Sequence, residues 1–292
     1  MKPNFAYFGS SHMSLVVLDE LERAGHVPVF VVTTPDKPQG RKLILTPTEV
    51  KTWAEKKNIP VFAAEKLNEE FTVILQKEIA KTKLDFCLVA SFGKIIPEKI
   101  IEAFGNRMIN IHPSLLPRYR GPSPLQSAIL ADEKNTGVSL LLIDREMDHG
   151  PIIAQENVTL TEWPTYEVYE EDMARRGARL LVAQFGNFAE GRYDSHVQDH
   201  SVATFTKKFR KEDGLINLGD DPYQNFRKIQ AFHEWPQAFF SAKHNGRDIR
   251  VKITEASYSE GVLTIDKVIP EGSKEMPYSD FLKGYAMERS GK

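Results

Sequence analysis

The sequence contains very little cysteine, no large excess of charge of either sign and no long hydrophobic run. Cys87 is the only cysteine among 292 residues and lies in an apolar stretch, so the chain cannot form a disulfide framework or a cysteine-based metal site. The formal net charge is −2 and the pI is near 6.5. This balance excludes a strongly basic nucleic-acid binder, and any RNA partner would have to be held by local patches.

Membrane and dinucleotide signals are missing as well. No apolar run reaches membrane-spanning length, and the first eleven residues are too weakly apolar for a signal peptide. The expected first strand is followed by Gly9-Ser10-Ser11-His12, which lacks the glycine spacing of a dinucleotide-binding loop. We therefore expect a soluble, cytoplasmic, monomeric protein that makes no membrane contact and binds no nicotinamide cofactor.

What the sequence does contain is an alternation of short apolar runs and helical patterns through about residue 188. Several of these runs are apolar on both faces, as strands covered by helices on both sides must be. The expected strands are residues 5–8, 27–33, 86–91, 107–111, 138–143 and 152–158. The alternation predicts an α/β fold with a doubly wound, mostly parallel sheet, which binds ligands outside the carboxyl ends of its strands.

Three helices are marked by their end signals. The first is expected to stop at Gly25, a residue suited to the left-handed position after a helix. A second should begin at Thr46 as N-cap, with Pro47 in the first turn and Glu49 completing a capping box. A third should begin at Asn68, before a stripe of apolar residues at helical spacing.

The pattern changes after a long helical region at residues 165–190. The next residues are polar without a clear period, and shorter β-like runs follow at 203–205, 237–242, 249–257 and 261–268. We therefore assign residues 1–190 to the first domain, 191–203 to a linker and 204–292 to a small, mostly β domain. With 41% hydrophobic residues, the chain can form a core in each domain.

Two polar residues end one of the apolar strands. Asn110 and His112 are two positions apart, and side chains alternate faces along a strand, so both should point to the same side. An amide donor and a titratable imidazole that converge at a strand end suit the stabilisation of a developing oxyanion. Taken alone, an asparagine or a histidine at a strand end is more often a turn or capping residue than a catalytic one.

Two loops could complete such a site. Residues 142–150 end a strand in an acidic loop, where either Asp144 or Asp148 could orient and charge-balance His112. An aspartate before a glycine can also simply form a turn. Residues 34–42 form a loop shaped by proline and glycine that ends in Arg41 and Lys42, and Arg41 could offer a bidentate fork to a phosphate or remain solvated.

These segments together resemble the 10-formyltetrahydrofolate-dependent formyltransferases. The likeness rests on Asn110-x-His112 followed by Ser-Leu-Leu-Pro-x-Tyr-Arg-Gly, with Asp148 and Gly150 further along the chain. Other segments resemble the members of the family that formylate methionyl-tRNA. These segments are the loop Pro35-Asp36-Lys37-Pro38-x-Gly40-Arg41, residues 60–62, and Ala231-Phe232-x-x-Trp235-Pro236.

The resemblance implies a role for several residues. It implies a Rossmann-like catalytic domain in which Asn110, His112 and Asp148 form the catalytic trio, with Asp148 holding His112 in the required tautomer and helping to remove the amine proton. No step requires a metal. The residues expected to bind 10-formyltetrahydrofolate, the formyl donor, are Ser114, Leu115, Leu116, Pro117, Ser91, Phe92, Gly93 and Asp144.

The resemblance also implies an acceptor. The second domain would be an OB-like barrel, here shortened by a hairpin, that contacts initiator methionyl-tRNA for translation initiation. The expected tRNA contacts are Arg41, Lys42, Lys207 and Lys208, although the last two could equally belong to a solvated surface. Two alternatives stay open: a formyltransferase acting on an amino-sugar nucleotide, and a non-catalytic RNA-binding relative.

Overall fold

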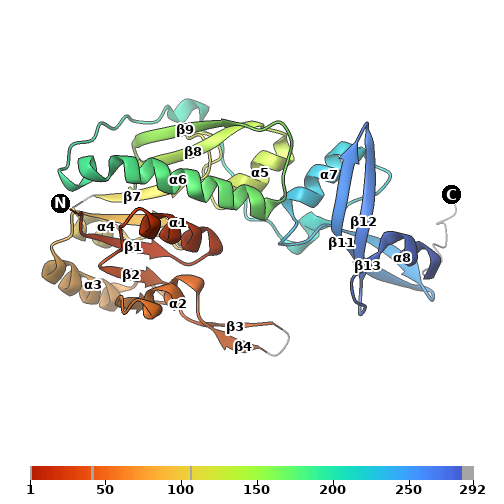
Figure 1. Ribbon diagram of the computed structural model, residues 1–292, viewed down its shortest axis with the longest axis horizontal. Helices are drawn as coiled ribbons and strands as arrows, with labels where there is room; N and C mark the ends of the chain where they lie inside the picture. The colour runs from red at the N-terminus through yellow and green to blue at the C-terminus, as the bar shows by residue number, and fades with distance from the viewer. Residues whose placement is uncertain (1, 41–42, 106, 285–292) are drawn as a thin grey trace. The chain divides into compact units, whose positions relative to one another are not determined.

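The computed structural model describes residues 2–40, 43–105 and 107–284, which form two compact units (Figure 1). Unit 1 comprises Met1–Pro122, Thr136–Val158 and Glu170–Thr206. Unit 2 comprises Ser123–Asn135, Thr159–Tyr169 and Lys207–Lys292. The last segment of unit 2 begins at Lys207, close to residue 204, where the second domain was expected to start. Two earlier segments, Ser123–Asn135 and Thr159–Tyr169, also belong to unit 2.

Unit 1 is built on a seven-stranded sheet. Its strands, in spatial order, are β5 (Val61–Ala63), β2 (Phe30–Thr33), β1 (Phe5–Gly9), β6 (Phe86–Ala90), β7 (Met108–His112), β8 (Asn135–Leu142) and β9 (Ile152–Thr159). The first five are parallel, and β8 runs antiparallel to β7. The predicted α/β class and mostly parallel sheet are confirmed, with β8 making the sheet mixed.

Helices cover both faces of this sheet, as Figure 1 shows. One face packs against α1 (His12–Arg23), α2 (Glu49–Lys56) and α6 (Tyr166–Ala189), and the other against α3 (Glu69–Thr82) and α4 (Glu98–Ala103). Along β1, Phe5 and Tyr7 join the first layer while Ala6 and Phe8 join the second. Alternate residues are therefore buried on opposite faces, which explains the continuous apolar runs in the sequence.

One predicted helix start is wrong by two residues. The N-cap of α2 is Thr48, whose hydroxyl accepts a hydrogen bond from the backbone amide of Lys51 at 3.1 Å. Thr46 instead ends the short strand β4 (Ile44–Thr46), which pairs with β3 (Lys37–Gln39). Threonines stand on both sides of Pro47, and the first of them, Thr46, belongs to a hairpin that was not predicted. The other two signals are confirmed, since α1 ends just before Gly25 and Asn68 caps α3.

Residues 191–203 lie along unit 1. His196 exchanges both backbone hydrogen bonds with Ile152 at 2.9 Å, and the side chain of Gln198 is buried. A short helix, η1 (His200–Val202), follows, and in place of the strand expected at 203–205 there is a single bridge between Phe205 and Arg120. This segment is held to unit 1 largely by backbone hydrogen bonds, which leave no periodic pattern of side chains. The sequence alone therefore suggested a linker here.

Unit 2 contains an antiparallel sheet. Its strands are β10 (Phe239–His244), β11 (Arg247–Ser259), β12 (Val262–Pro270) and β13 (Met276–Pro277). The described residues of this unit also form the helices α5 (Pro124–Ala131), η2 (Lys211–Gly214), α7 (Pro222–Ala231) and α8 (Tyr278–Gly284). Residues from α7, α8 and the sheet share one core. Among the described residues, no helix combines the length and apolar character needed to cross a membrane.

Candidate active site

Strand β7 carries Asn110 and His112 to the carboxyl edge of the sheet. Ile109 and Ile111 of the same strand are buried in the core layer of α1, α2 and α6. The strand alternation therefore turns Asn110 and His112 to the opposite face, where His112 is the last residue of the strand. His112 is 4% exposed and Asn110 is half-buried.

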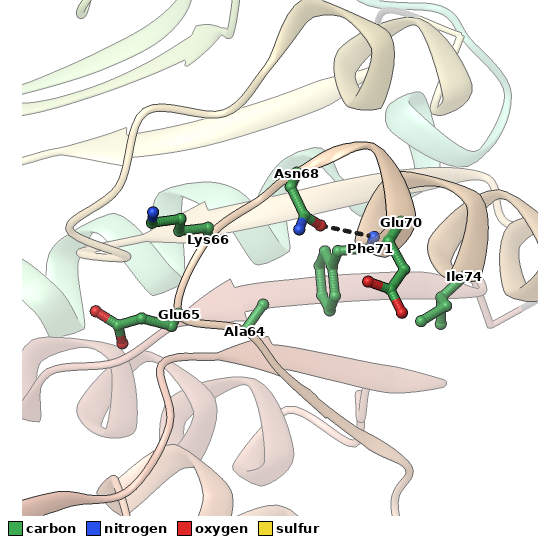
Figure 2. A pocket seen from close by; sticks show the side chains of 7 residues that line it. All are labelled: Ala64, Glu65, Lys66, Asn68, Glu70, Phe71 and Ile74. Carbon is green, nitrogen blue, oxygen red and sulfur yellow. Dashed lines mark hydrogen bonds between the residues drawn. The ribbon is translucent and has the colours of Figure 1, made fainter.

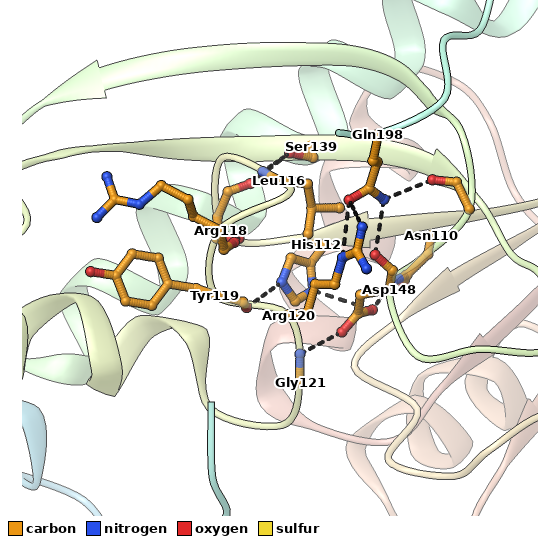
Figure 3. Close-up of polar contacts among 12 residues, drawn as sticks. Asn110, His112, Leu116, Arg118, Tyr119, Arg120, Gly121, Ser139, Asp148 and Gln198 are labelled. Carbon is orange, nitrogen blue, oxygen red and sulfur yellow. Dashed lines mark hydrogen bonds and ion pairs between the residues drawn. The ribbon is translucent and has the colours of Figure 1, made fainter. Parts of the chain in front are cut away.

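The two ring nitrogens of His112 have different partners, as Figure 3 shows. Nε2 lies 3.0 Å from the carbonyl oxygen of Tyr119. Because a carbonyl can only accept a hydrogen bond, Nε2 carries a hydrogen, and Nδ1 is left facing Oδ1 of Asp148 at 3.5 Å. In the neutral ring, the carbonyl of Tyr119 thus favours the hydrogen on Nε2, while the Asp148 carboxylate can accept from Nδ1 when the ring is protonated.

Asp148 is the acid that the loop places beside His112. Its Oδ2 accepts a hydrogen bond from the backbone amide of Gly121 at 2.8 Å, and its Oδ1 lies 3.4 Å from Nδ2 of Asn110. Asp144 is engaged elsewhere, with Nδ1 of His149 at 2.7 Å and the backbone amide of Glu146. The geometry therefore favours Asp148 over Asp144 as the partner of His112.

The loop that carries Asp148 closes tightly on Gly150. A Cβ atom at Gly150 would lie 1.9 Å from the carbonyl oxygen of Leu142. This position thus admits only glycine, and it returns the chain from the end of β8 to the start of β9. The close approach fixes where the intervening loop presents Asp148.

A buried network that sequence reasoning missed lies behind Asp148. Gln198 accepts hydrogen bonds from Nε and an Nη of Arg120 at 3.1 and 2.6 Å, and it donates to the carbonyl oxygens of Asp148 and Gly150. Arg120 lies in the motif that follows His112, so the sequence already placed it near the candidate site. Gln198 lies in the segment read as a linker, where no sequence signal marked it.

The four residues expected to line the folate pocket after β7 form a tightly bonded loop. Ser114 is buried and its hydroxyl donates to the carbonyl oxygen of Arg118 at 2.7 Å. The Leu116 amide donates to the Ser139 hydroxyl at 3.1 Å, while Leu115 and Pro117 are half-buried. The side chains of Leu115 and Pro117 can contact a ligand, whereas Leu116 is buried against Leu141 and Ile152 and the Ser114 hydroxyl already has a partner.

The neighbouring loop after β6 contributes backbone more than side chains. Ser91 and Gly93 are exposed and adopt left-handed backbone conformations, with φ of +45° and +74°. Between them, the ring of Phe92 is buried against Phe8, with centroids 5.3 Å apart. Phe92 therefore belongs to the core, and the backbone around it is what this loop offers to a ligand. Asp144, the last expected folate contact, is half-buried.

The expected tRNA contacts belong to two segments. Lys207 and Lys208 are exposed, and Lys207 pairs with Asp213 at 3.0 Å. Arg41 and Lys42 lie outside the described residues.

Other features of the described residues suggest no competing chemistry. The side chain of Cys87 is buried, and burial raises the pKa of its thiol well above its usual range, which leaves it a neutral core residue. A separate pocket follows β5 (Figure 2) and is lined by Ala64, Glu65, Lys66, Asn68, Glu70, Phe71 and Ile74. The Asn68 side chain there is occupied in capping α3. No cluster of three potential metal ligands is found within the described ranges.

Comparison with known proteins identifies the family. The profile of the family described as "Formyl transferase" matches residues 1–185. A methionyl-tRNA formyltransferase of Campylobacter curvus is 36% identical, over 99% of this chain and 93% of that protein.

Solved structures agree at the level of the fold. HypX from Aquifex aeolicus in complex with tetrahydrofolic acid aligns with a TM-score of 0.67 at 17% identity, covering 98% of this chain and 48% of that one. An N-formyltransferase from Helicobacter canadensis, in complex with folinic acid and dTDP-3-aminofucose, aligns with a TM-score of 0.62 at 18% identity, covering 90% and 95%. The resemblance read from the sequence is confirmed, and the chain belongs to the formyl transferase family of formyl-transferring enzymes.

Proposed function

We propose that the protein transfers the formyl group of 10-formyltetrahydrofolate to the α-amine of methionine esterified to initiator tRNA. The observation that carries the proposal is the convergence of Asn110, His112 and Asp148 at the carboxyl end of β7. The acceptor is supported by the similarity to methionyl-tRNA formyltransferases over nearly the whole chain.

Asn110 and His112 would act on the formyl oxygen. When the amine attacks the formyl carbon, negative charge develops on that oxygen, and the amide Nδ2 of Asn110 can donate to it. His112 in its protonated form can donate from Nδ1, because Nε2 is held by the carbonyl of Tyr119. One preorganised donor of this kind is typically worth ~3 kcal/mol, or ~100-fold in rate.

Asp148 would receive the proton that the attacking amine loses. Its carboxylate borders both donors, and its side chain is 12% exposed. Proton transfer can run directly or through one water, and the proton is then available for the folate nitrogen that leaves when the carbon–nitrogen bond breaks. In the free protein the contacts of Oδ1 are long, at 3.4 and 3.5 Å. Such contacts commonly tighten only when substrate is bound.

The folate donor would lie between the two loops at the carboxyl ends of β6 and β7. The half-buried apolar side chains of Leu115 and Pro117 suit the faces of an aromatic ring system, and the exposed residues Ser91 and Gly93 suit polar ring edges, while Leu116 is buried with Leu141 and Ile152 and supports the loop. Because β6 and β7 are adjacent and parallel, their carboxyl ends lie at the same edge of the sheet. A ligand bound there would reach Asn110 and His112.

Unit 2 would contribute to binding tRNA. We interpret its antiparallel sheet as a reduced form of the OB-like barrel that often contacts nucleic acids. The exposed Lys207 and Lys208 stand at the start of this unit's C-terminal segment and can contact phosphates. Arg41 and Lys42 are proposed as further contacts on the sequence alone.

A competition between acceptors tests the proposal. The purified protein would receive 10-formyltetrahydrofolate together with equimolar initiator methionyl-tRNA and a dTDP-linked amino sugar, and formylated products would be separated and counted. We expect formyl-methionyl-tRNA as the product. Transfer only to the sugar would overturn the proposed acceptor, and tRNA binding without any transfer would indicate a non-catalytic relative. His112→Ala should bind tRNA and lose most of the transfer.

A further inference from the structure

Gln198 connects the segment after α6 to the turn that carries Asp148. Its side chain is 4% exposed, and its Nε2 donates to the carbonyl oxygen of Asp148 at 2.9 Å and to that of Gly150 at 2.7 Å. Both hydrogens of the amide are thus used on the two residues that flank His149. Figure 3 shows the bond to Asp148. One buried side chain therefore clamps this turn from both ends.

Arg120 fixes which way the Gln198 amide points. The guanidinium group of Arg120 is 3% exposed and donates through Nε and an Nη to Oε1 of Gln198 at 3.1 and 2.6 Å. A guanidinium group has no acceptor atom, so it must face the amide oxygen. The amide nitrogen must then face the two carbonyls. A flipped amide would place its N–H groups against those of Arg120 and its oxygen against the two carbonyl oxygens.

The clamp acts on a residue whose backbone conformation has an alternative, because Asp148 is left-handed. Its φ is +53°, in the left-handed region, which aspartate adopts more readily than most non-glycine residues but less readily than a negative φ. The Asp148 side chain makes one short bond, from the Gly121 amide to Oδ2 at 2.8 Å, whereas the contacts of Oδ1 with Asn110 and His112 are long, at 3.4 and 3.5 Å. The two short bonds from Gln198 act on the backbone of the turn itself.

We propose that Gln198, oriented by Arg120, is the positioning residue that keeps the Asp148 carboxylate in place for proton transfer. Without the clamp, Asp148 can relax to a negative φ, which swings its carboxylate away from the Gly121 amide and from the two donors of β7. This inference rests on the proposed function of Asp148. The place of the Asp148 side chain can nevertheless be observed without any turnover.

Gln198→Glu separates positioning from mere stability. The glutamate has the same shape and can keep an ion pair with Arg120, but it presents an acceptor in place of the two N–H donors. Misplacement of a catalytic group by about 1 Å can cost ~100-fold. We expect kcat to fall about 10- to 100-fold, on the scale of such misplacements, with little change in the KM for folate or tRNA. A purely structural role predicts wild-type kcat in this variant.

Two further variants keep the test decisive. Gln198→Ala removes the clamp without introducing a charge and should show the same loss of kcat. Asn225→Ala is the matched control, because Asn225 is also 4% exposed and its amide donates to a carbonyl, that of Asn217, at 2.8 Å. It removes an equally buried amide with no contact to the Asp148 turn, so it should lower the melting temperature and leave kcat unchanged.

A crystal structure of Gln198→Ala supplies the readout that is independent of activity. We expect the bond between the Gly121 amide and Asp148 Oδ2, 2.8 Å in the wild type, to be lost. An unchanged Asp148 turn, or a wild-type kcat in both Gln198 variants, would overturn the inference. If the wild type itself transfers no formyl group, the proposed function fails, and the crystal structure still decides whether Gln198 positions Asp148.

Discussion

Replacing Asn110 by alanine should reduce turnover far more than stability. In the free protein, its Nδ2 donates to Asp148 Oδ1 at 3.4 Å, at the long end of the range for a hydrogen bond. Its loss should therefore cost under about 1 kcal/mol of folding free energy. In the transition state the same amide would face a developing oxyanion, where one donor is worth about 2.7–4 kcal/mol. We expect kcat to fall about 100- to 1,000-fold with a nearly unchanged melting temperature.

The assay for Asn110→Ala is steady-state formylation of methionyl-tRNA at saturating 10-formyltetrahydrofolate, alongside thermal unfolding. Asn187→Ala is a suitable control, since Asn187 is an exposed asparagine of α6 whose side chain donates a hydrogen bond to Gln184; it should behave as wild type. A kcat for Asn110→Ala within about threefold of wild type, which is less than 1 kcal/mol, would refute the donor role. A large rise in KM at constant kcat would assign Asn110 to ground-state binding instead.

Three further predictions concern packing, pH and charge. Gly177→Ala would place a Cβ atom 2.4 Å from the side chain of Ile111, which lies between Asn110 and His112 on β7. The variant should lose about 1–3 kcal/mol of folding free energy and have a lower kcat. Gly186→Ala in the same helix is the control, because its Cβ meets nothing within 4 Å and should stabilise the protein. The Glu167 carboxylate, 2.8 Å away, raises the pKa of His233 above its ordinary value. This ion pair stabilises the folded state fully below the pKa that His233 has in the unfolded chain, and the stabilisation is lost as pH rises through the pKa of His233 in the folded protein. The melting temperatures of wild type and His233→Gln should therefore differ more at about pH 6 than at about pH 9. An equal difference at both pH values would contradict the charge effect. Lys208→Ala should raise the KM for tRNA and reduce the salt slope by about one, and an unchanged slope would reject a phosphate contact.

The catalytic strand was predictable because its information is local. Asn110 and His112 are two residues apart in an apolar run, and strand geometry alone puts both on one face. The end of a parallel strand is also where such sheets bind ligands. The core layers followed for the same reason, since alternate residues of β1 are buried against different sets of helices.

The environment of Asp148 was not predictable, because it depends on backbone contacts between distant segments. The choice between Asp144 and Asp148 turns on the path of one loop, which is set by the contact of Gly150 with the carbonyl of Leu142. The clamp by Gln198 acts on carbonyl groups, which every residue carries, so no side-chain pattern records it. The carbonyl of Tyr119, which lies 3.0 Å from Nε2 of His112, could not be predicted for the same reason.

A crystal structure with a bound, non-transferable analogue of 10-formyltetrahydrofolate would test the central claim most directly. The account predicts that the analogue of the formyl oxygen lies within hydrogen-bonding distance of Asn110 Nδ2 and His112 Nδ1, with the Asp148 carboxylate beside the formyl-bearing nitrogen. Folate bound away from the carboxyl end of β7, or bound with its formyl-bearing nitrogen turned away from these three side chains, would contradict it.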